Sequence, residues 1–275
     1  MPQQALCLIH ANCQGEPLAD ALRLSPDFAR LFRIRHYTNY IKEPLEQQDL
    51  DTASVFLYQH LGPCWEAVAS DSLLARLAPS AVRFCLPNPF FMGYWPFWTA
   101  HSHIDFSDTL LDRLIEAGAQ KPEIFKIYLE GDIRKFTDPD AVVADTLARE
   151  QKKEASCDVK TASLVEELWR SEPLFYTVNH PGKRLLFHIA DAVLDFLGLP
   201  ALTNEAKEAY TPDYANFELP IHPQLARYLS LPFAGQGHEF RIFDRRMDFA
   251  RYVSRYIDCR QQGYTESFMA YLQLV

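Results

Sequence analysis

The sequence predicts an α/β fold built on a parallel β-sheet. Ala5–Ile9 is a short, uninterrupted apolar run, which is typical of a strand buried on both faces. Along the first hundred residues such runs alternate with helical patterns, and this alternation is characteristic of strands joined by crossover helices. After Phe106 the patterns are mostly helical, so additional helices are expected in the C-terminal half.

The expected elements follow in order from these patterns. Gly15 and Pro17 mark the start of a helix with Leu18, Ala21 and Leu22 on its inner face. Further strands are expected at Leu31–Tyr37, Ser54–Tyr58 and Ala81–Leu86, and Tyr176–Val178 could be a short strand or an extended lead-in to the next helix. Further helices are expected at Asp71–Leu77, Asp108–Ala117, Pro122–Leu129, Asp138–Glu154, Ala162–Trp169, Pro223–Leu229 and Arg245–Cys259. Asn179–Gly182 introduces the most regular helix, whose apolar face includes Leu185 and Leu186 and which ends at Gly198 and Pro200. We expect a single α/β domain over 1–275, with a sheet core (1–105), a helical insertion (106–175) and a C-terminal part (176–275).

Composition narrows the class of protein. The chain has 275 residues, of which 48% are hydrophobic, and a formal net charge of −9. That charge disfavours generic binding to nucleic acid, which needs a phosphate-neutralising surface. The six cysteines form no C-x-x-C pair, and neither a secretory signal nor an apolar run long enough to span a membrane is visible. These features predict a cytoplasmic protein with free thiols and no transmembrane segment.

Cys13 is the first candidate for chemistry, because it follows the first strand and precedes a helix. Ligands bind at the carboxyl ends of strands in open α/β sheets, and a helix N-terminus lowers the pKa of a thiol. Backbone N–H groups of the turn could also hold an oxyanion. The alternative is that Cys13 is a small buried residue.

His180 is the second candidate. If Asn179 caps the following helix, His180 lies in its first turn, where the helix dipole keeps the imidazole neutral and able to accept a proton. A neutral histidine beside a cysteine is what nucleophilic thiol catalysis requires. A capping or packing role is the alternative.

Other polar residues could complete a site. Gln59, His60 and Asn88 follow strands and reach the same sheet edge as Cys13, where an amide could donate to an oxyanion or make loop hydrogen bonds. Lys183 and Arg184 could hold phosphates. A group of arginines near the C-terminus could also hold phosphates: Arg241, Arg245, Arg246, Arg251 and Arg255. The alternative is that these arginines form a solvated surface with salt bridges to Asp244 and Asp248.

Two further clusters have competing interpretations. The aromatic segment Phe90–Trp98 could form a wall for a sugar or an adenine, or could be core under a loop. His101, His103 and Asp105 alternate and could face a metal ion, but no fourth partner has a recognisable spacing, so no metal site is expected.

The segment Leu8–Gln14, the Pro-Asn loop after a strand and the Asn179-His180-Pro181 turn together resemble the WcbI family of capsular polysaccharide biosynthesis proteins. Asn12, Cys13 and Gln14 match its Gly-Asn-Cys-Gln signature, with Ala11 in place of Gly. The resemblance implies a three-layer core like that of the SGNH hydrolases, and an acetyltransferase that binds coenzyme A or acetyl-coenzyme A.

The resemblance also implies roles for particular residues. Cys13 takes the nucleophile position, His180 is the base and Asn88 takes the oxyanion position. Gln59 stands where the superfamily has Gly, and its Asp-x-x-His element is absent before His180. The residues expected around the cofactor are Asn12, Gln14, Gln59, His60, Asn179, Lys183 and Arg184.

The leading hypothesis is therefore an O-acetyltransferase that uses acetyl-coenzyme A on a polysaccharide or its nucleotide-linked precursor. Acyl transfer could pass through Cys13, or go directly to the sugar with Cys13 lining the pocket. One alternative is an SGNH-like carbohydrate esterase with water as acceptor. Another is a non-catalytic component that binds coenzyme A or a glycan.

Overall fold

The computed structural model describes residues 4–101, 104–264 and 267–275. The chain forms two compact units. Unit 1 comprises Met1–Pro89, Arg149–Glu167 and Asn179–Asp213, and unit 2 comprises Phe90–Ala148, Leu168–Val178 and Tyr214–Val275. The predicted division of one domain into three segments stays a prediction.

The main sheet lies in unit 1. Its described strands are all parallel and have the order β2–β1–β3–β4. They are β1 (Ala5–Ala11), β2 (Phe32–Thr38), β3 (Ala53–Gln59) and β4 (Val82–Leu86). Cys7 of β1 is level with Ile34 of β2 and Val55 of β3. The prediction of an α/β fold with a parallel sheet is confirmed, and the four expected N-terminal strands are present.

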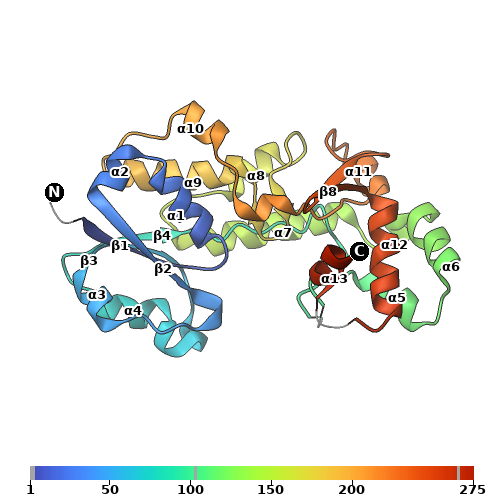
Figure 1. Cartoon of the computed structure of the whole chain (residues 1–275), viewed down its shortest axis with the longest axis horizontal. Coiled ribbons are helices and arrows are strands. Elements are labelled where there is room, and N and C mark those ends of the chain that lie inside the picture. Colours follow the sequence, from blue (N-terminus) through green and yellow to red (C-terminus); the bar gives the residue numbers. More distant parts are fainter. Residues whose placement is uncertain (1–3, 102–103, 265–266) are drawn as a thin grey trace. The chain divides into compact units, whose positions relative to one another are not determined.

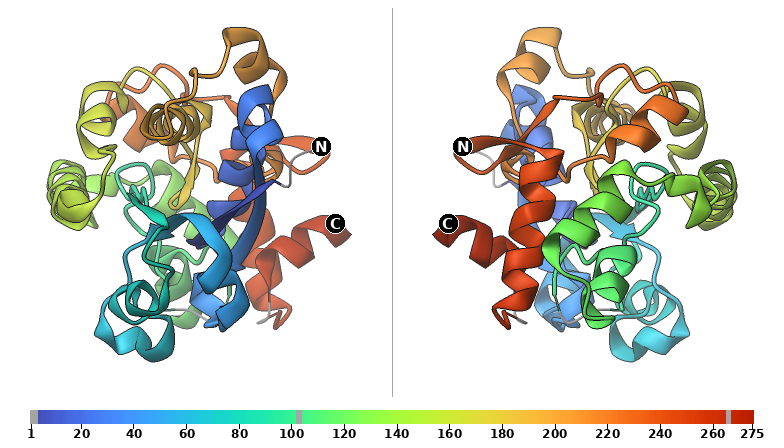
Figure 2. Two further views of the ribbon diagram at one scale, coloured as in Figure 1. Left: turned by 90° about the vertical axis from the view of Figure 1, so that its left-hand side faces the viewer. Right: turned by 90° about the vertical axis from the view of Figure 1, so that its right-hand side faces the viewer.

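Helices cover both faces of this sheet and make a three-layer unit (Figures 1 and 2). Cys7, Ile9 and Ala11 of β1 face helices α1 (Gly15–Arg23) and α9 (Lys183–Phe196). Leu6 and Leu8 face α3 (Gln47–Thr52) and α4 (Ser70–Arg76) on the other side. Burial of a Leu or Ile side chain contributes about 1.5–3 kcal/mol, so a strand that is apolar on both faces stabilises both layers. The SGNH-like relationship stays a prediction.

Shorter elements complete unit 1, and several were not predicted. Helix α2 (Pro26–Leu31) begins with a Ser25 cap, and α10 (Asn204–Ala209) begins with a Thr203 cap. The remaining elements are the short helices η1 (Asn39–Ile41), η2 (Pro63–Val68) and η5 (Glu154–Ser156), and strand β6 (His180–Pro181). Helices α7 (Pro139–Lys153) and α8 (Ala162–Leu168) contain residues of both units.

Unit 2 is mostly helical. Its elements are α5 (Thr109–Glu116), α6 (Lys121–Phe125), η3 (Lys126–Glu130), η4 (Ile133–Lys135), α11 (Pro223–Tyr228), α12 (Phe249–Gln261), α13 (Phe268–Leu274), β5 (Phe175–Thr177), β7 (Glu239–Ile242) and β8 (Arg245–Asp248). A short helix η6 (Asp213–Asn216) crosses the last boundary between the units. Helix α12 packs against α5 and α13.

The predicted helix over Arg245–Cys259 is wrong at its start. Arg245–Asp248 form β8, which pairs antiparallel with β7, and burial alternates along both strands. The helix begins only at Phe249, because the Asp248 carboxylate accepts a hydrogen bond from the Arg251 N–H at 2.7 Å and so caps it.

The aromatic segment is core. Phe91 and Tyr94 are fully buried, and the Phe91 ring lies 4.8 Å from that of Tyr94 and 5.7 Å from that of Phe175. The Trp95 indole donates to the Leu219 carbonyl at 2.9 Å. Of the two interpretations, packing under a loop is therefore the one observed for these rings.

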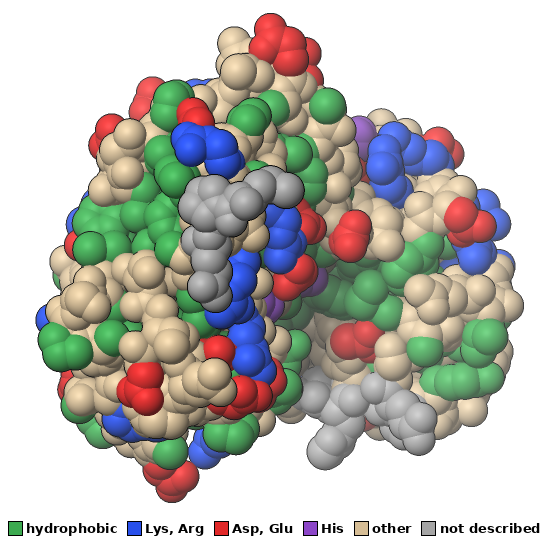
Figure 3. All heavy atoms as spheres, turned by 60° about the vertical axis from the view of Figure 1, so that its left-hand side comes forward, with side chains coloured by type: hydrophobic (Ala, Val, Ile, Leu, Met, Phe, Trp, Pro, Cys, Tyr) green, Lys and Arg blue, Asp and Glu red, His purple; other side chains and the backbone are tan. Residues whose placement is uncertain are grey.

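Two further features concern the apolarity of the helices and the distribution of charged side chains. Among the described residues, no helix has the length and apolarity needed to cross a lipid bilayer. On the face drawn in Figure 3, acidic side chains (red) lie beside the basic ones (blue).

Candidate functional site

The turn after β1 carries the first candidate residue. Asn12, Cys13 and Gln14 connect β1 to α1, and the Gly15 N–H donates to the Asn12 carbonyl at 2.9 Å. The Asn12 side-chain oxygen also accepts from the Gln14 N–H at 2.9 Å, which tightens the turn. The tight turn brings α1 close to β2: a Cβ on Gly15 would lie 2.3 Å from Nε2 of His36.

Side-chain amides from three strand ends meet at this turn. The Asn12 N–H donates to Oε1 of Gln59 at 2.9 Å, and Nδ2 of Asn12 donates to Oδ1 of Asn88 at 3.0 Å. Gln59 is buried and its Nε2 donates to Oε1 of Gln14 and to the Pro87 carbonyl, both at 3.2 Å. Gln59 and Asn88 therefore reach the turn that carries Cys13, as predicted, and Gln59 acts within the structure as a bridge between β1 and the loop after β4.

Gln14 joins this turn to two other segments. Its Nε2 donates to the Pro89 carbonyl at 3.0 Å and to the Asn179 carbonyl at 2.7 Å. The side chain is buried, so its hydrogen bonds exchange little with water. Gln14 thus holds the segment before His180 against the Cys13 turn.

Cys13 is half-buried, and its sulfur accepts a hydrogen bond from Nδ2 of Asn179 at 3.7 Å. Burial raises the pKa of the Cys13 thiol, opposed by a smaller effect from a backbone hydrogen bond. The predicted lowering of this pKa by the helix N-terminus is wrong, because desolvation of the thiolate outweighs the stabilisation by the turn. At neutral pH the group is a thiol, which needs a base to become a nucleophile.

The predicted surroundings of His180 also need correction. Asn179 does not cap a helix: His180 and Pro181 form β6, and α9 begins at Lys183 with Gly182 as its N-cap. The side chain of Asn179 instead contacts Cys13, and the residue lies four positions before the first residue of the helix. Burial lowers the pKa of His180 to about 4, so the ring is neutral as expected, but desolvation rather than the helix dipole is the cause.

Lys183 and Arg184 line a separate pocket of about 500 Å³ within unit 1. The Lys183 ammonium donates to the Glu208 carbonyl at 2.9 Å, and Lys207 forms an ion pair with Asp191 at 2.5 Å. His188 also lines this pocket, and its Nε2 lies 2.9 Å from the Lys160 carbonyl. Basic groups of α9 and α10 therefore gather at this pocket.

The remaining predicted residues are more peripheral. His60 follows β3 as expected and is exposed. In the C-terminal basic group, Arg245 forms an ion pair with Asp244 at 3.5 Å, which agrees with the alternative of a salt-bridged surface. His103 lies outside the described residues. Over residues 4–101, 104–264 and 267–275, no group of three or more His, Cys, Asp and Glu side chains is arranged to hold a metal ion.

Sequence reasoning missed two residues that shape the site. Lys153, at the end of α7, donates to the Asn88 carbonyl at 2.7 Å and pairs with Glu150 at 2.9 Å, which holds the Asn88 loop in place. Asn39 donates to Oε1 of Gln59 at 3.3 Å from the end of β2. The position of Asn39 just after a strand was a signal in the sequence, whereas the contact of Lys153 depends on tertiary packing alone.

The fold and the site define a parallel α/β protein with a half-buried thiol at the carboxyl end of its first strand. The chain belongs to the WcbI family, whose model, described as polysaccharide biosynthesis enzyme WcbI, matches residues 6–202. The resemblance stated from the sequence is confirmed. None of the curated proteins matches the chain.

A solved structure has the same fold. It is described as WcbI, a novel polysaccharide biosynthesis enzyme, in a native form without a disulfide bond between coenzyme A (COA) and a cysteine of that protein. The match has a TM-score of 0.75 at 17% sequence identity and covers 99% of this chain and 93% of the other.

Proposed function

We propose that this protein is an O-acetyltransferase of capsular polysaccharide biosynthesis that uses acetyl-coenzyme A. The observation that carries the proposal is the position of the Cys13 thiol, which lies at a strand end beside the Asn179 amide and a fixed network of amides. Two comparisons support the proposal. The chain belongs to a family of polysaccharide biosynthesis enzymes, and the related solved structure is described with reference to coenzyme A and a cysteine of that protein.

The residues present suit coenzyme A. Its pantetheine thiol suits a partly desolvated position, and Cys13 is half-buried. Its phosphates need cations, and Lys183 and Arg184 offer them in a pocket of about 500 Å³ at the N-terminus of α9. We assign Asn12, Gln14, Gln59, His60 and Asn179 to the walls around the cofactor.

The chemistry assigns one task to each catalytic residue. Acetyl-coenzyme A supplies an activated acyl carbonyl and a thiol leaving group. His180, neutral because its pKa is lowered to about 4, takes the proton of the Cys13 thiol as the sulfur bonds to the acyl carbon. Nδ2 of Asn88 donates to the developing oxyanion, since Oδ1 of Asn88 is already engaged by Asn12. As the bond between the acyl carbon and the sulfur of coenzyme A breaks, His180 gives its proton to the departing thiolate.

Transfer to the sugar repeats the same steps with a different nucleophile. His180 takes the proton of a sugar hydroxyl, whose oxygen bonds to the acyl carbon as the bond to Cys13 sulfur breaks. The proton then returns to Cys13, and an O-acetyl ester leaves. In direct transfer the hydroxyl attacks the thioester at once and Cys13 only lines the pocket.

Mass spectrometry separates these two routes. The protein is incubated with acetyl-coenzyme A without acceptor, quenched in acid and digested. An acetyl group on the peptide that contains Cys13, absent in Cys13→Ala, is expected for the covalent route. Transfer activity without this adduct would assign the direct route. Cys64→Ala, which removes an exposed cysteine, is the matched control.

Calorimetric titration with coenzyme A tests the proposal itself. We expect micromolar binding that weakens about tenfold or more in Lys183→Ala, since a charge-assisted hydrogen bond contributes roughly 1.5–3 kcal/mol. Lys152→Ala, at an exposed lysine of α7, should bind as the wild type does. Absence of binding would refute the transferase and leave an SGNH-like carbohydrate esterase. Binding with no transfer to any acceptor would favour a non-catalytic component.

A further inference from the structure

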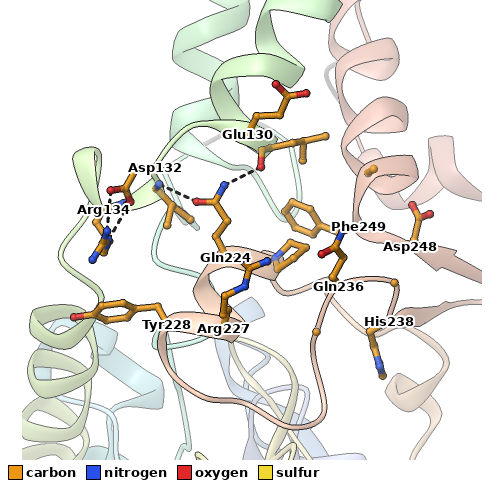
Figure 4. Close-up of a pocket in the computed structure, with 16 residues that line it drawn as sticks. Glu130, Asp132, Arg134, Gln224, Arg227, Tyr228, Gln236, His238, Asp248 and Phe249 are labelled. Atoms are coloured by element: carbon orange, nitrogen blue, oxygen red, sulfur yellow. Dashed lines mark hydrogen bonds and ion pairs between the residues drawn. The ribbon is translucent and has the colours of Figure 1, made fainter.

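Unit 2 contains a pocket that the proposed chemistry does not use. It has a volume of about 790 Å³ and is lined by residues of η3, η4, α11, the loop before β7 and the start of α12 (Figure 4). Pockets for small ligands typically measure about 300–1,000 Å³. The size therefore suits a ligand of one to a few rings.

The walls of this pocket are held by internal hydrogen bonds. Oε1 of Gln224 accepts from the Ile133 N–H at 3.3 Å and its Nε2 donates to the Leu129 carbonyl at 2.8 Å, so α11 is tied to the segment opposite (Figure 4). Arg134 is fixed by two hydrogen bonds to Asp132, both at 3.0 Å. A site with fixed walls loses little conformational entropy when a ligand binds.

An aromatic side chain is also fixed at the wall. The Tyr228 ring lies under the Arg134 guanidinium at 5.6 Å, and its hydroxyl donates to Asp140 at 2.5 Å. The side chain is nevertheless 41% exposed. An exposed ring held in one orientation offers a flat apolar surface to a ligand.

The polar groups of the lining have both signs and both hydrogen-bonding roles. In the described part of the chain, the side chains of Arg227, Gln236 and Glu130 have no hydrogen-bond or ion-pair partner. Arg227 donates only, Glu130 accepts only, and Gln236 does both. A polyphosphate would be repelled by the carboxylates of Glu130 and Asp248. An apolar ligand would cover the polar side chains and leave them without hydrogen-bond partners.

We propose that this pocket is a saccharide-binding site, because a sugar combines hydroxyls that both donate and accept with flat apolar C–H faces. Arg227, Gln236 and Glu130 bind hydroxyls, and the Tyr228 ring packs against a sugar face. The identity of the saccharide rests on the proposed function: it is the unacetylated form of the polysaccharide made by the organism that encodes this chain.

Saturation-transfer NMR and calorimetry with defined fragments test the site. The probe is a set of oligosaccharides of two to six sugars, prepared from the surface polysaccharide of the source organism by partial hydrolysis and removal of esters with mild base. We expect binding to the full-length protein, weakened about tenfold or more in Arg227→Ala and in Gln236→Ala. Both residues are exposed, so both variants should fold, which their melting temperatures verify.

Matched controls make the outcome decisive. Arg113→Ala removes an exposed arginine of α5 in the same unit, outside the pocket, and should bind the fragments as the wild type does. Fragments that fail to bind, or that bind equally well to Arg227→Ala, would overturn the proposal. So would binding of uridine diphosphate at this site in place of the fragments. Calorimetry with coenzyme A on the same samples reports the proposed function separately, so the two failures are distinguishable.

Discussion

The side-chain amide of Asn179 donates a hydrogen bond to the thiol sulfur of Cys13 at 3.7 Å, although the two residues are 166 positions apart. Gln14 reinforces this contact, because its own amide donates to the Asn179 carbonyl at 2.7 Å. His180 follows Asn179 directly, so these two bonds tie the proposed base to the turn that carries the proposed nucleophile.

Replacement of His180 should abolish most of the transfer activity. His180→Ala removes the base that takes the proton of Cys13 or of the sugar hydroxyl, and a general base contributes roughly 10²–10⁴-fold to a rate. We expect kcat with acetyl-coenzyme A and deacetylated polysaccharide to fall by about 10²-fold or more. His101→Ala, at an exposed histidine, should retain full activity. A His180→Ala enzyme with wild-type kcat would exclude the residue as the base.

The pH dependence of activity should reflect the buried state of His180. Burial lowers its pKa to about 4, so the ring remains a competent base as the pH falls through the range where a solvated histidine becomes charged. We expect kcat/KM to be retained between pH 7 and pH 5 and to decrease only as the pH approaches 4. A half-maximal value near pH 6.5 in a complete profile would contradict this account.

His10 should make the protein sensitive to acid. It is fully buried in β1, neither ring nitrogen has a hydrogen-bond partner in the described structure, and its pKa is lowered to about 4. Between pH 6.5 and 4 the unfolded chain binds a proton that the folded chain does not, so the free energy of unfolding falls as the pH falls. At pH 5 this single group should cost roughly 2 kcal/mol.

Urea unfolding of His10→Leu at pH 8 and pH 5 measures the effect. The variant should be more stable than the wild type at both values, because a buried polar group without a partner is removed, and the gain should be larger at pH 5. His101→Leu, at an exposed site, should show the pH dependence of the wild type. An equal gain at both values would mean that His10 does not titrate as described.

Gly15→Ala should destabilise the fold through one contact. The new Cβ would lie 2.3 Å from Nε2 of His36 and 2.8 Å from its Cδ2, closer than any real contact. Overpacking of this kind costs about 1–3 kcal/mol in the free energy of unfolding. The double variant Gly15→Ala/His36→Ala should recover most of that loss. If the cost persists without the His36 ring, the backbone rather than this side chain requires glycine.

Gln59→Leu should weaken both the fold and the site. The buried amide of Gln59 serves the Asn12 N–H, Asn39, Gln14 and the Pro87 carbonyl, so its loss leaves several buried polar groups without partners. Each such group costs about 1–3 kcal/mol, and the freed Asn12 no longer orients Asn88. Gln48→Leu, at an exposed position of α3, is the control in urea unfolding and in the transfer assay. Equal stability of the two variants would contradict the role of the network.

The sequence by itself determined the sheet and the place of the candidate thiol. Continuous apolar runs can be satisfied only by burial on two faces, so β1 and β3 could be recognised as strands of a parallel sheet without tertiary information. Because parallel strands end at a common edge, Gln59 and Asn88 could be expected to reach the turn that carries Cys13, and both contact Asn12 of that turn.

Only the tertiary structure decided how deeply each polar group is buried and which partners it has. The pKa of Cys13 rises and that of His180 falls because the folded chain removes water from both, and no local pattern encodes desolvation. The segment Arg245–Asp248 is a strand because β7 offers it a partner, and Lys153 reaches Asn88 because α7 packs there. Such contacts join residues that are far apart in sequence, so local propensity and spacing cannot reveal them.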